Sequence, residues 1–123
     1  MSSIFIHLEN EDDFIKFTEE CRVCVVDFFA TWCGPCVKLG EELENLVPQN
    51  ENIDVATHDD LENNLSEKVM FLKINVDEFG DLASLFKIRG IPHIIFFKNG
   101  KLQKQTVAGL NPDKVINIIN ELY

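Results

Sequence analysis

Apolar and polar residues follow one another along this chain in patterns that predict strands and helices in turn. Short runs rich in β-branched and aromatic residues predict five strands, at residues 4–8, 23–29, 69–76, 94–98 and 102–107. Apolar residues at helical spacing predict four helices, at residues 11–20, 34–47, 81–87 and 112–122. This order predicts an α/β domain, in which helices cover both faces of a mixed sheet with right-handed parallel crossovers.

Turn-forming and capping residues mark the ends of several of these elements. Asn99-Gly100 between two strand patterns is typical of a two-residue β-hairpin, which gives the sheet an antiparallel edge. Asn111 as cap and Pro112 in the first turn predict the start of the last helix. Pro48 is expected to end the helix that begins near Gly34.

The segment at residues 48–68 differs in composition from the rest of the chain. It holds six acids and one lysine, so its charge of −5 is half of the net charge of the chain: Glu51, Asp54, Asp59, Asp60, Glu62, Glu67 and Lys68. Residues 62–68 can form a short extra helix, but the segment as a whole is expected to be an exposed insertion. Two interpretations stay open, a tolerated surface loop and an acidic lobe that selects partners.

Length, composition and charge narrow the classes of function. The 123 residues predict a single domain at 1–123, and 11 basic against 21 acidic residues give a net charge of −10. A surface this acidic repels phosphate backbones and anionic lipids, so nucleic acid and membrane are not expected as partners. No apolar run reaches the roughly 20 residues of a membrane span, and the first residues lack the features of a secretory leader. We therefore expect a cytoplasmic protein with cysteines that are reduced, redox-active or metal-bound.

The motif Trp32-Cys33-Gly34-Pro35-Cys36 lies where an apolar strand gives way to a helix. The first helical turn brings Cys33 and Cys36 side by side, close enough to form a disulfide. The unpaired N–H groups and positive end of the helix stabilise a thiolate there and lower the pKa of the first cysteine. Gly34 leaves the backbone open to an incoming partner, and Pro35 fits the first turn. The alternative is a pair of buried or zinc-binding thiols.

A zinc site has to be considered because Cys21 and Cys24 form a second pair with the same spacing. The eight residues between the two pairs are fewer than the roughly 15–20 expected of a four-cysteine zinc site, and a core strand occupies them. We therefore expect no metal site, with Cys24 in the core and Cys21 at a helix end. A regulatory disulfide or modification at Cys21 remains an alternative.

Asp27 is a single acidic residue within the apolar stretch Val25-Val26-Asp27-Phe28-Phe29. Burial of an ionised carboxylate is unfavourable, so a buried Asp27 should have a raised pKa, in the range useful for proton transfer. The alternative is that Asp27 points to solvent at a sheet edge.

With these motifs in this order, the sequence resembles the thioredoxin family. The Trp-Cys-Gly-Pro-Cys motif is the thioredoxin pattern, and further stretches resemble the family in the family's order: residues 27–31, 71–77, 89–92, 96–100 and Gly109. The resemblance covers nearly everything outside residues 48–68. It implies a thioredoxin fold, with a central mixed sheet of about five strands flanked by about four helices.

The resemblance also implies an activity, the reduction of protein disulfides by dithiol–disulfide exchange. Cys33 would be the nucleophile and Cys36 the resolving thiol, while Asp27 would take and return the proton of Cys36 and Lys73 would interact with Asp27. An NADPH-dependent thioredoxin reductase would regenerate the dithiol. The implied partners are that reductase and disulfide-containing target proteins, and we expect a monomer without a bound cofactor.

The family further implies a cis peptide bond before Pro92, with the backbone of Ile91 free to pair with an extended substrate. A flat apolar docking surface around Cys33 is then expected from these residues: Trp32, Gly34, Pro35, Ile91, Pro92 and Gly109. Two positions depart from the family pattern. Glu41 stands where thioredoxins usually have a proline that kinks the helix, and His93 stands where they usually have threonine.

These departures leave the predicted reacting atoms unchanged. His93 either tunes the Cys33 thiolate near neutral pH or is an ordinary half-exposed strand residue. Gly40, which precedes Glu41, can supply a helix bend by another route. Two other functions stay open, a docking or scaffold subunit whose thiols are incidental, and an oxidase or isomerase.

Overall fold

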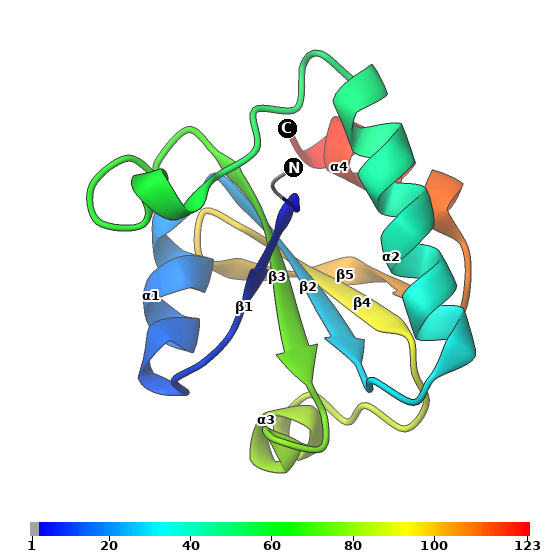
Figure 1. Ribbon diagram of the computed structural model, residues 1–123. Coiled ribbons are helices and arrows are strands. Elements are labelled where there is room, and N and C mark those ends of the chain that lie inside the picture. Colours follow the sequence, from blue (N-terminus) through cyan, green and yellow to red (C-terminus); the bar gives the residue numbers. More distant parts are fainter. Residues whose placement is uncertain (1–2) are drawn as a thin grey trace.

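The computed structural model describes residues 3–123 and shows a five-stranded mixed sheet between two layers of helices (Figure 1). The strands are β1 (Phe5–His7), β2 (Val23–Phe29), β3 (Val69–Asn75), β4 (His93–Lys98) and β5 (Lys101–Ala108). Their order is β1-β3-β2-β4-β5, with β1 and β2 parallel to β3, and β4 antiparallel to both β2 and β5. The predicted fold class is confirmed. Met1 and Ser2, part of the stretch on which the leader expectation rests, lie outside the described residues.

Four α-helices complete the fold close to their predicted positions: α1 (Asp12–Glu20), α2 (Gly34–Leu46), α3 (Gly80–Leu85) and α4 (Pro112–Leu122). The α-helical part of this segment ends at Leu46, before Pro48 as expected, and Val47–Gln49 follows it as a 3₁₀ turn. Proline is tolerated there since the first turn of a helix needs no N–H donor from it. None of the helices in residues 3–123 is long and apolar enough to cross a membrane.

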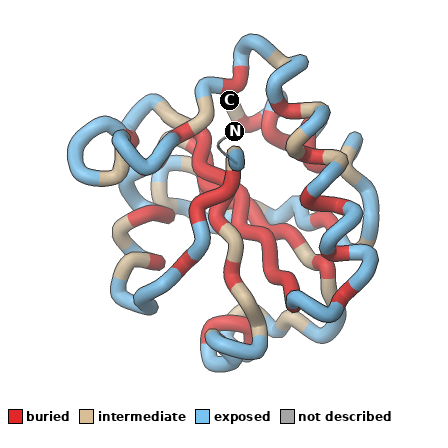
Figure 2. The backbone as a smooth tube through the Cα atoms, in the orientation of Figure 1, coloured by how far each residue is buried: buried red, intermediate tan, exposed pale blue. Residues whose placement is uncertain are grey.

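The two faces of the sheet carry separate apolar clusters, because successive side chains of a strand point to opposite faces. Val23 and Val25 of β2 pack in the cluster that includes Leu39 and Leu43 of α2 and residues of α4. The other face of β2 packs in the cluster that includes residues of α1 and α3. Every residue of β2 is buried, as predicted for a central strand (Figure 2). Asp27 follows Val23 and Val25 in the alternation, so it faces the α2 side.

The acidic segment at residues 48–68 is packed more closely against the domain than an exposed insertion would be. The predicted short helix at 62–68 does not form, and the segment instead contains a 3₁₀ turn, His58–Asp60. Three of its apolar side chains are buried: Ile53, Ala56 and Leu65. Val55 also forms a parallel bridge with Val69, at the start of β3. These contacts anchor the segment at both faces of the sheet, while most of its acids remain exposed.

Candidate active site

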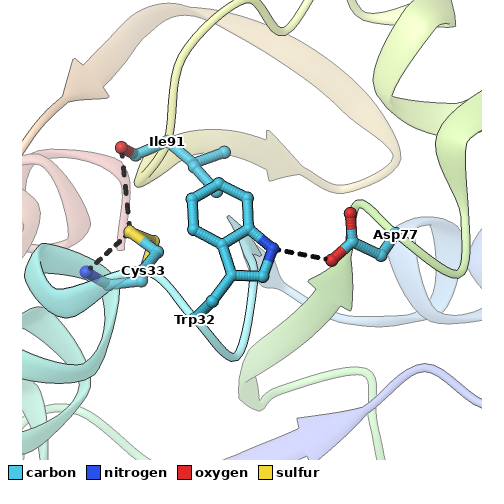
Figure 3. Close-up of a disulfide and its surroundings, with 5 residues drawn as sticks. Trp32, Cys33, Asp77 and Ile91 are labelled. Carbon is cyan, nitrogen blue, oxygen red and sulfur yellow. Dashed lines mark hydrogen bonds between the residues drawn. A yellow bond between two sulfur atoms is a disulfide. The ribbon is translucent and has the colours of Figure 1, made fainter.

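A disulfide joins Cys33 and Cys36 at the amino end of α2, after the short loop that follows β2 (Figure 3). Their Cα atoms are 5.2 Å apart, within the range that disulfides require. Cys33 is the N-cap of α2, and its sulfur accepts a hydrogen bond from the backbone N–H of Cys36 at 3.1 Å. The predicted pairing in the first helical turn is confirmed, and the oxidised state of a dithiol pair is thus compatible with this fold.

The two cysteines differ in burial and in their position relative to the start of α2. Cys33 is 6% exposed and Cys36 only 1%, and both pack with Phe29 and Ala30 at the end of β2. A negative charge on the Cys33 sulfur would lie at the helix N-cap, where a backbone N–H already points to it and the helix dipole favours an anion. The geometry therefore favours a thiolate at Cys33 and a protonated thiol at Cys36.

The surface beside the disulfide is formed by residues that lie far apart in the sequence. Trp32 is 72% exposed, and its indole Nε1 donates a hydrogen bond of 2.9 Å to Asp77 Oδ2 (Figure 3). The Ile91 carbonyl oxygen lies 3.9 Å from Cys33 Sγ on the other side of the motif. The peptide bond between Ile91 and Pro92 is cis, as the resemblance implied. The disulfide is thus bordered by the Trp32 indole, which a hydrogen bond orients, and by the backbone of Ile91.

The other residues expected to form the docking surface are distributed around this border. Gly34 and Pro35 are exposed in the first turn of α2, and a side chain at Gly34 would meet no atom within 4 Å. Pro92 is buried, and its carbonyl accepts a hydrogen bond of 2.9 Å from the N–H of Gly109. Gly109 has a positive φ of 84°, which few residues other than glycine adopt readily. This bond joins the loop after β5 to the loop before β4.

Asp27 is 1% exposed, and neither carboxylate oxygen has a hydrogen-bond partner among the described residues. The alternative of a solvent-facing side chain is therefore wrong. Burial raises the pKa of Asp27 to about 6, and the positive charge of Lys73 opposes this rise. Lys73 lies directly opposite Asp27 in the parallel register of β2 and β3. The sheet thus brings this acid and this lysine to the face that α2 covers.

The second cysteine pair is separate from the disulfide. Cys21 and Cys24 are both buried and unpaired, in the apolar cluster beneath α1. Burial raises the pKa of the Cys21 thiol to about 12 and that of Cys24 well above its usual range. Across residues 3–123 no cluster of three or more metal-ligating side chains is found. Both thiols therefore pack as small apolar groups, which leaves the regulatory alternative at Cys21 without support from its environment.

The two departures from the family pattern lie at different positions around the site. His93 is half-buried at the start of β4, and burial lowers its pKa. Glu41 is exposed on α2, which runs without a break from Gly34 to Leu46. A cavity of about 380 Å³ lies between α2, β1 and β3, and its lining includes Glu41 and Lys73.

Comparison with known proteins agrees with this geometry. The thioredoxin family model matches residues 5–121, nearly the whole chain. This chain belongs to the thioredoxin family. Thioredoxin from Malassezia sympodialis is 36% identical over 108 residues, covering 88% of this chain and 89% of the relative. Thioredoxin-1 from Saccharomyces cerevisiae is 35% identical over 91 residues, covering 74% and 72%.

Solved thioredoxin structures share the fold as well. The crystal structure of Malassezia sympodialis thioredoxin superposes with a TM-score of 0.70 at 34% identity, covering 94% of this chain and 89% of that one. Oxidised mitochondrial thioredoxin 3 from Saccharomyces cerevisiae gives a TM-score of 0.75 at 27% identity, covering 98% and 99%. Together with the Cys33–Cys36 disulfide, family membership makes this protein a thiol–disulfide oxidoreductase, a protein-disulfide reductase.

Sequence reasoning missed some features that shape this thioredoxin site. Asp77, the hydrogen-bond partner of Trp32, belongs to the stretch at residues 71–77, and the resemblance assigns it no role of its own. Its position two residues after β3 places it at the carboxyl end of the sheet, where the motif also lies, so strand ends were a usable clue. The surroundings of Lys73, which include Phe5, Phe29 and Gly40, had no clue in the sequence because they come from three different elements.

Proposed function

We propose that the protein reduces disulfides of target proteins with Cys33 as nucleophile and Cys36 as resolving thiol. The Cys33 thiolate attacks one sulfur of the target disulfide, a mixed disulfide forms, and the second target sulfur leaves as a thiolate that takes up a proton. The placement of Cys33 as the N-cap of α2, with the Cys36 N–H directed at its sulfur, carries this assignment. This placement stabilises negative charge at Cys33 and at no other cysteine of the chain.

The second step releases the target. Cys36 loses its proton and attacks the Cys33 sulfur, so that the target leaves with its second thiol and the Cys33–Cys36 disulfide forms. Two electrons have then passed from the protein to the target. We assign the acceptance of the Cys36 proton to Asp27, a buried carboxylate on the sheet face that α2 covers, whose pKa of about 6 suits proton transfer near neutral pH. Lys73, across the register from Asp27, is assigned to tune this carboxylate.

The docking surface proposed for targets surrounds Cys33. Its members combine an exposed indole, a backbone edge and small or rigid residues: Trp32, Gly34, Pro35, Ile91, Pro92 and Gly109. An extended target segment can pair with the free backbone of Ile91 and place its disulfide against the Cys33 sulfur. Recognition through backbone atoms and one aromatic surface suits a reductase that accepts many targets.

Regeneration by an NADPH-dependent thioredoxin reductase, a cytoplasmic location, a role in electron transport and a monomeric state complete the proposal. The first of these has a direct test. Purified protein, NADPH and a thioredoxin reductase are mixed with a disulfide protein such as insulin, and NADPH consumption is followed by absorbance. Cys33→Ser and Cys36→Ser should each reduce the turnover to the background of the reductase alone.

The reduction potential of the Cys33–Cys36 pair, measured in glutathione buffers, tests the direction of the reaction. A potential clearly more negative than that of the cytosolic glutathione pool supports the reductase. A potential near or above that pool would instead support an oxidase or isomerase. Biological activity that survives both serine substitutions would support a scaffold role.

A further inference from the structure

The positive charges of this protein are concentrated in one part of the chain. The other 92 residues hold six basic residues against 21 acids, a net charge of −15. Residues 82–112 contain no acid but five basic residues: Lys87, Arg89, Lys98, Lys101 and Lys104. This stretch includes β4, β5 and the loop that carries the cis peptide bond before Pro92. One side of an otherwise acidic protein is therefore basic.

β5 is the long edge strand of the sheet within this basic stretch. Among the described strands it pairs with β4 alone, whereas β1, at the other edge, has only three residues (Figure 1). Six of the eight residues of β5 are exposed, and they include Lys101 and Lys104. An edge strand has backbone N–H and C=O groups without a strand partner, so another extended chain can pair with it. We call the outer side of β5, with these two lysines, the basic edge.

The basic edge leads directly to the proposed docking surface. Gly109 follows β5, and its N–H donates a hydrogen bond of 2.9 Å to the Pro92 carbonyl. At this end Arg89 adds a further positive charge, because it lines a cavity of about 210 Å³ together with Trp32 and Ile91. An extended segment of eight residues spans about 26 Å. Such a segment, paired along β5, would end beside the docking surface.

The charges of the basic edge determine which extended chain suits it. A second copy of β5 would bring lysine next to lysine, and like charges on neighbouring strands are unfavourable. Acidic side chains on an incoming strand would instead meet the ammonium groups of Lys101 and Lys104, which form no salt bridge with any residue of 3–123. Strand pairing also needs a peptide backbone, which a nucleic acid lacks. The complementary partner is therefore an acidic peptide segment.

We propose that the basic edge binds an acidic, extended segment of a target protein, which joins the sheet as a sixth strand and brings the neighbouring disulfide to Cys33. This inference deepens the proposed function and rests on it, because it names the class of protein disulfide that is favoured. Backbone pairing aligns the segment with β5, and the lysines select its acidic residues. A target held both at β5 and at Cys33 binds at lower concentration than one held at Cys33 alone.

The first experiment measures binding without any redox step. The oxidised protein is titrated with eight-residue peptides that lack cysteine, and its backbone amides are followed by NMR. One peptide alternates glutamate and threonine, and the other has proline in place of each threonine, so it keeps the charge but loses strand-pairing N–H groups. We expect the threonine peptide to shift the amides of β5 and slow their hydrogen exchange. It should bind about tenfold more tightly than the proline peptide.

Lys104→Glu and Lys38→Glu are a matched pair of variants. Each reverses one exposed positive charge, but Lys104 lies in the middle of β5 and Lys38 on α2. Lys104 is preferred to Lys101 because the hairpin end of β5 already has an acid nearby, Glu19 of α1, whose backbone packs against Gly100. Lys104→Glu should weaken binding of the threonine peptide by about threefold to tenfold, and Lys38→Glu by less than about 1.5-fold. The first effect should decrease at about 0.5 M salt.

Activity provides the second measurement. Two peptide substrates carry the same intramolecular disulfide, followed by either the glutamate–threonine or the glutamate–proline segment, and are assayed with NADPH and a thioredoxin reductase. The threonine substrate should have a KM about tenfold lower at a similar kcat, since the segment contributes binding and not chemistry. Lys104→Glu should remove most of this difference and leave the reduction of the proline substrate unchanged.

The possible outcomes separate this inference from the proposed function. Equal binding of the two peptides would show that charge alone attracts them and would refute strand pairing. Amides of β5 that shift with protein concentration in the absence of peptide would show a second copy at the basic edge and would refute the acidic partner. If both substrates are reduced with equal KM and β5 does not respond, the docking site is wrong and the proposed function stands. If neither substrate is reduced, the proposed function fails, and the NMR titration still decides what the basic edge binds.

Discussion

The buried carboxylate of Asp27 should make the protein less stable at neutral pH than an otherwise equal protein without that charge. Asp27 is 1% exposed, and burial raises its pKa from 3.8 to about 6. Well below pH 4 the carboxyl group is protonated in both the folded and the unfolded chain and contributes no pH dependence. As the pH rises from about 4 to about 6, the unfolded chain releases the proton while the folded protein keeps it. Stability therefore falls with pH in this window.

The size of the effect follows from the same pKa values. At about 1.4 kcal/mol per pH unit, a pKa raised by about two corresponds to a loss of about 3 kcal/mol, complete above about pH 6. Asp27→Asn removes the titration but keeps the shape of the side chain. We therefore expect the free energy of unfolding of Asp27→Asn, minus that of the parent, to increase by about 2.5 kcal/mol between pH 4 and pH 7, the rest of the change falling below pH 4.

Urea unfolding of the oxidised proteins between pH 4 and pH 8, followed by circular dichroism, measures this difference. A buried amide has its own cost, but that cost does not change with pH, so the slope and not the offset carries the result. Asp59→Asn, at an exposed position, is the control and should show no comparable slope. A difference that stays flat, or that decreases as the pH rises, would show that burial does not raise the pKa of Asp27 and would remove the basis for its role as a proton acceptor.

Three further predictions concern the thiols and the acidic segment. A Cys36→Ser variant has no resolving thiol and should therefore accumulate a mixed disulfide with a target protein. This species should be visible on a non-reducing gel and absent after reduction. A gel without this band would contradict the roles assigned to Cys33 and Cys36. In the oxidised native protein, Cys21 and Cys24 should resist alkylation at pH 8, because burial raises the pKa of both thiols. Mass spectrometry should detect two labels only after unfolding. Labelling of the native protein would support the regulatory alternative at Cys21. Leu65→Ala in the acidic segment should lower the free energy of unfolding by about 2 to 3 kcal/mol, because Leu65 is buried. Leu102→Ala, at an exposed position, is the control and should change it by less than about 0.5 kcal/mol. Equal effects of the two substitutions would show that the acidic segment is not packed against the domain.

Elements with local determinants could be predicted from the sequence. Asn99 and Gly100 have φ angles of 50° and 85°, and both residue types adopt positive φ readily, so the hairpin between β4 and β5 follows from the dipeptide itself. The uniform apolar character of residues 23–29 likewise identified β2 as the central strand. In these cases the signal lies within a few neighbouring residues, and tertiary contacts only confirm it.

The acidic segment shows why other features could not be predicted in this way. Ile53, Ala56 and Leu65 are buried, but their spacing follows neither the period of a strand nor that of a helix. The bridge between Val55 and Val69 joins residues on either side of the turns, and it depends on the position of β3 in the sheet. The many acids between these residues dominated the pattern and favoured the prediction of an exposed loop. Periodicity detects regular elements but not a loop anchored by isolated side chains.

The arrangement of Asp27 and Lys73 explains how an apolar sheet face can hold a titratable pair. Within each strand the preceding residues on that face are apolar, and the charged residue comes near the carboxyl end: Val23, Val25 and Asp27 in β2, and Val69, Phe71 and Lys73 in β3. The parallel register places the two charged residues opposite each other, on the sheet face that α2 covers. Two residues nearer the start of each strand, the same pair would lie among the side chains of the apolar cluster, where burying the charge of either residue would cost more free energy. Two residues farther along β2, at the position of Phe29, the carboxyl group would be closer to water and its pKa nearer to the usual range. The position of the pair in the register therefore combines a stable core with a carboxyl group that can exchange a proton near neutral pH.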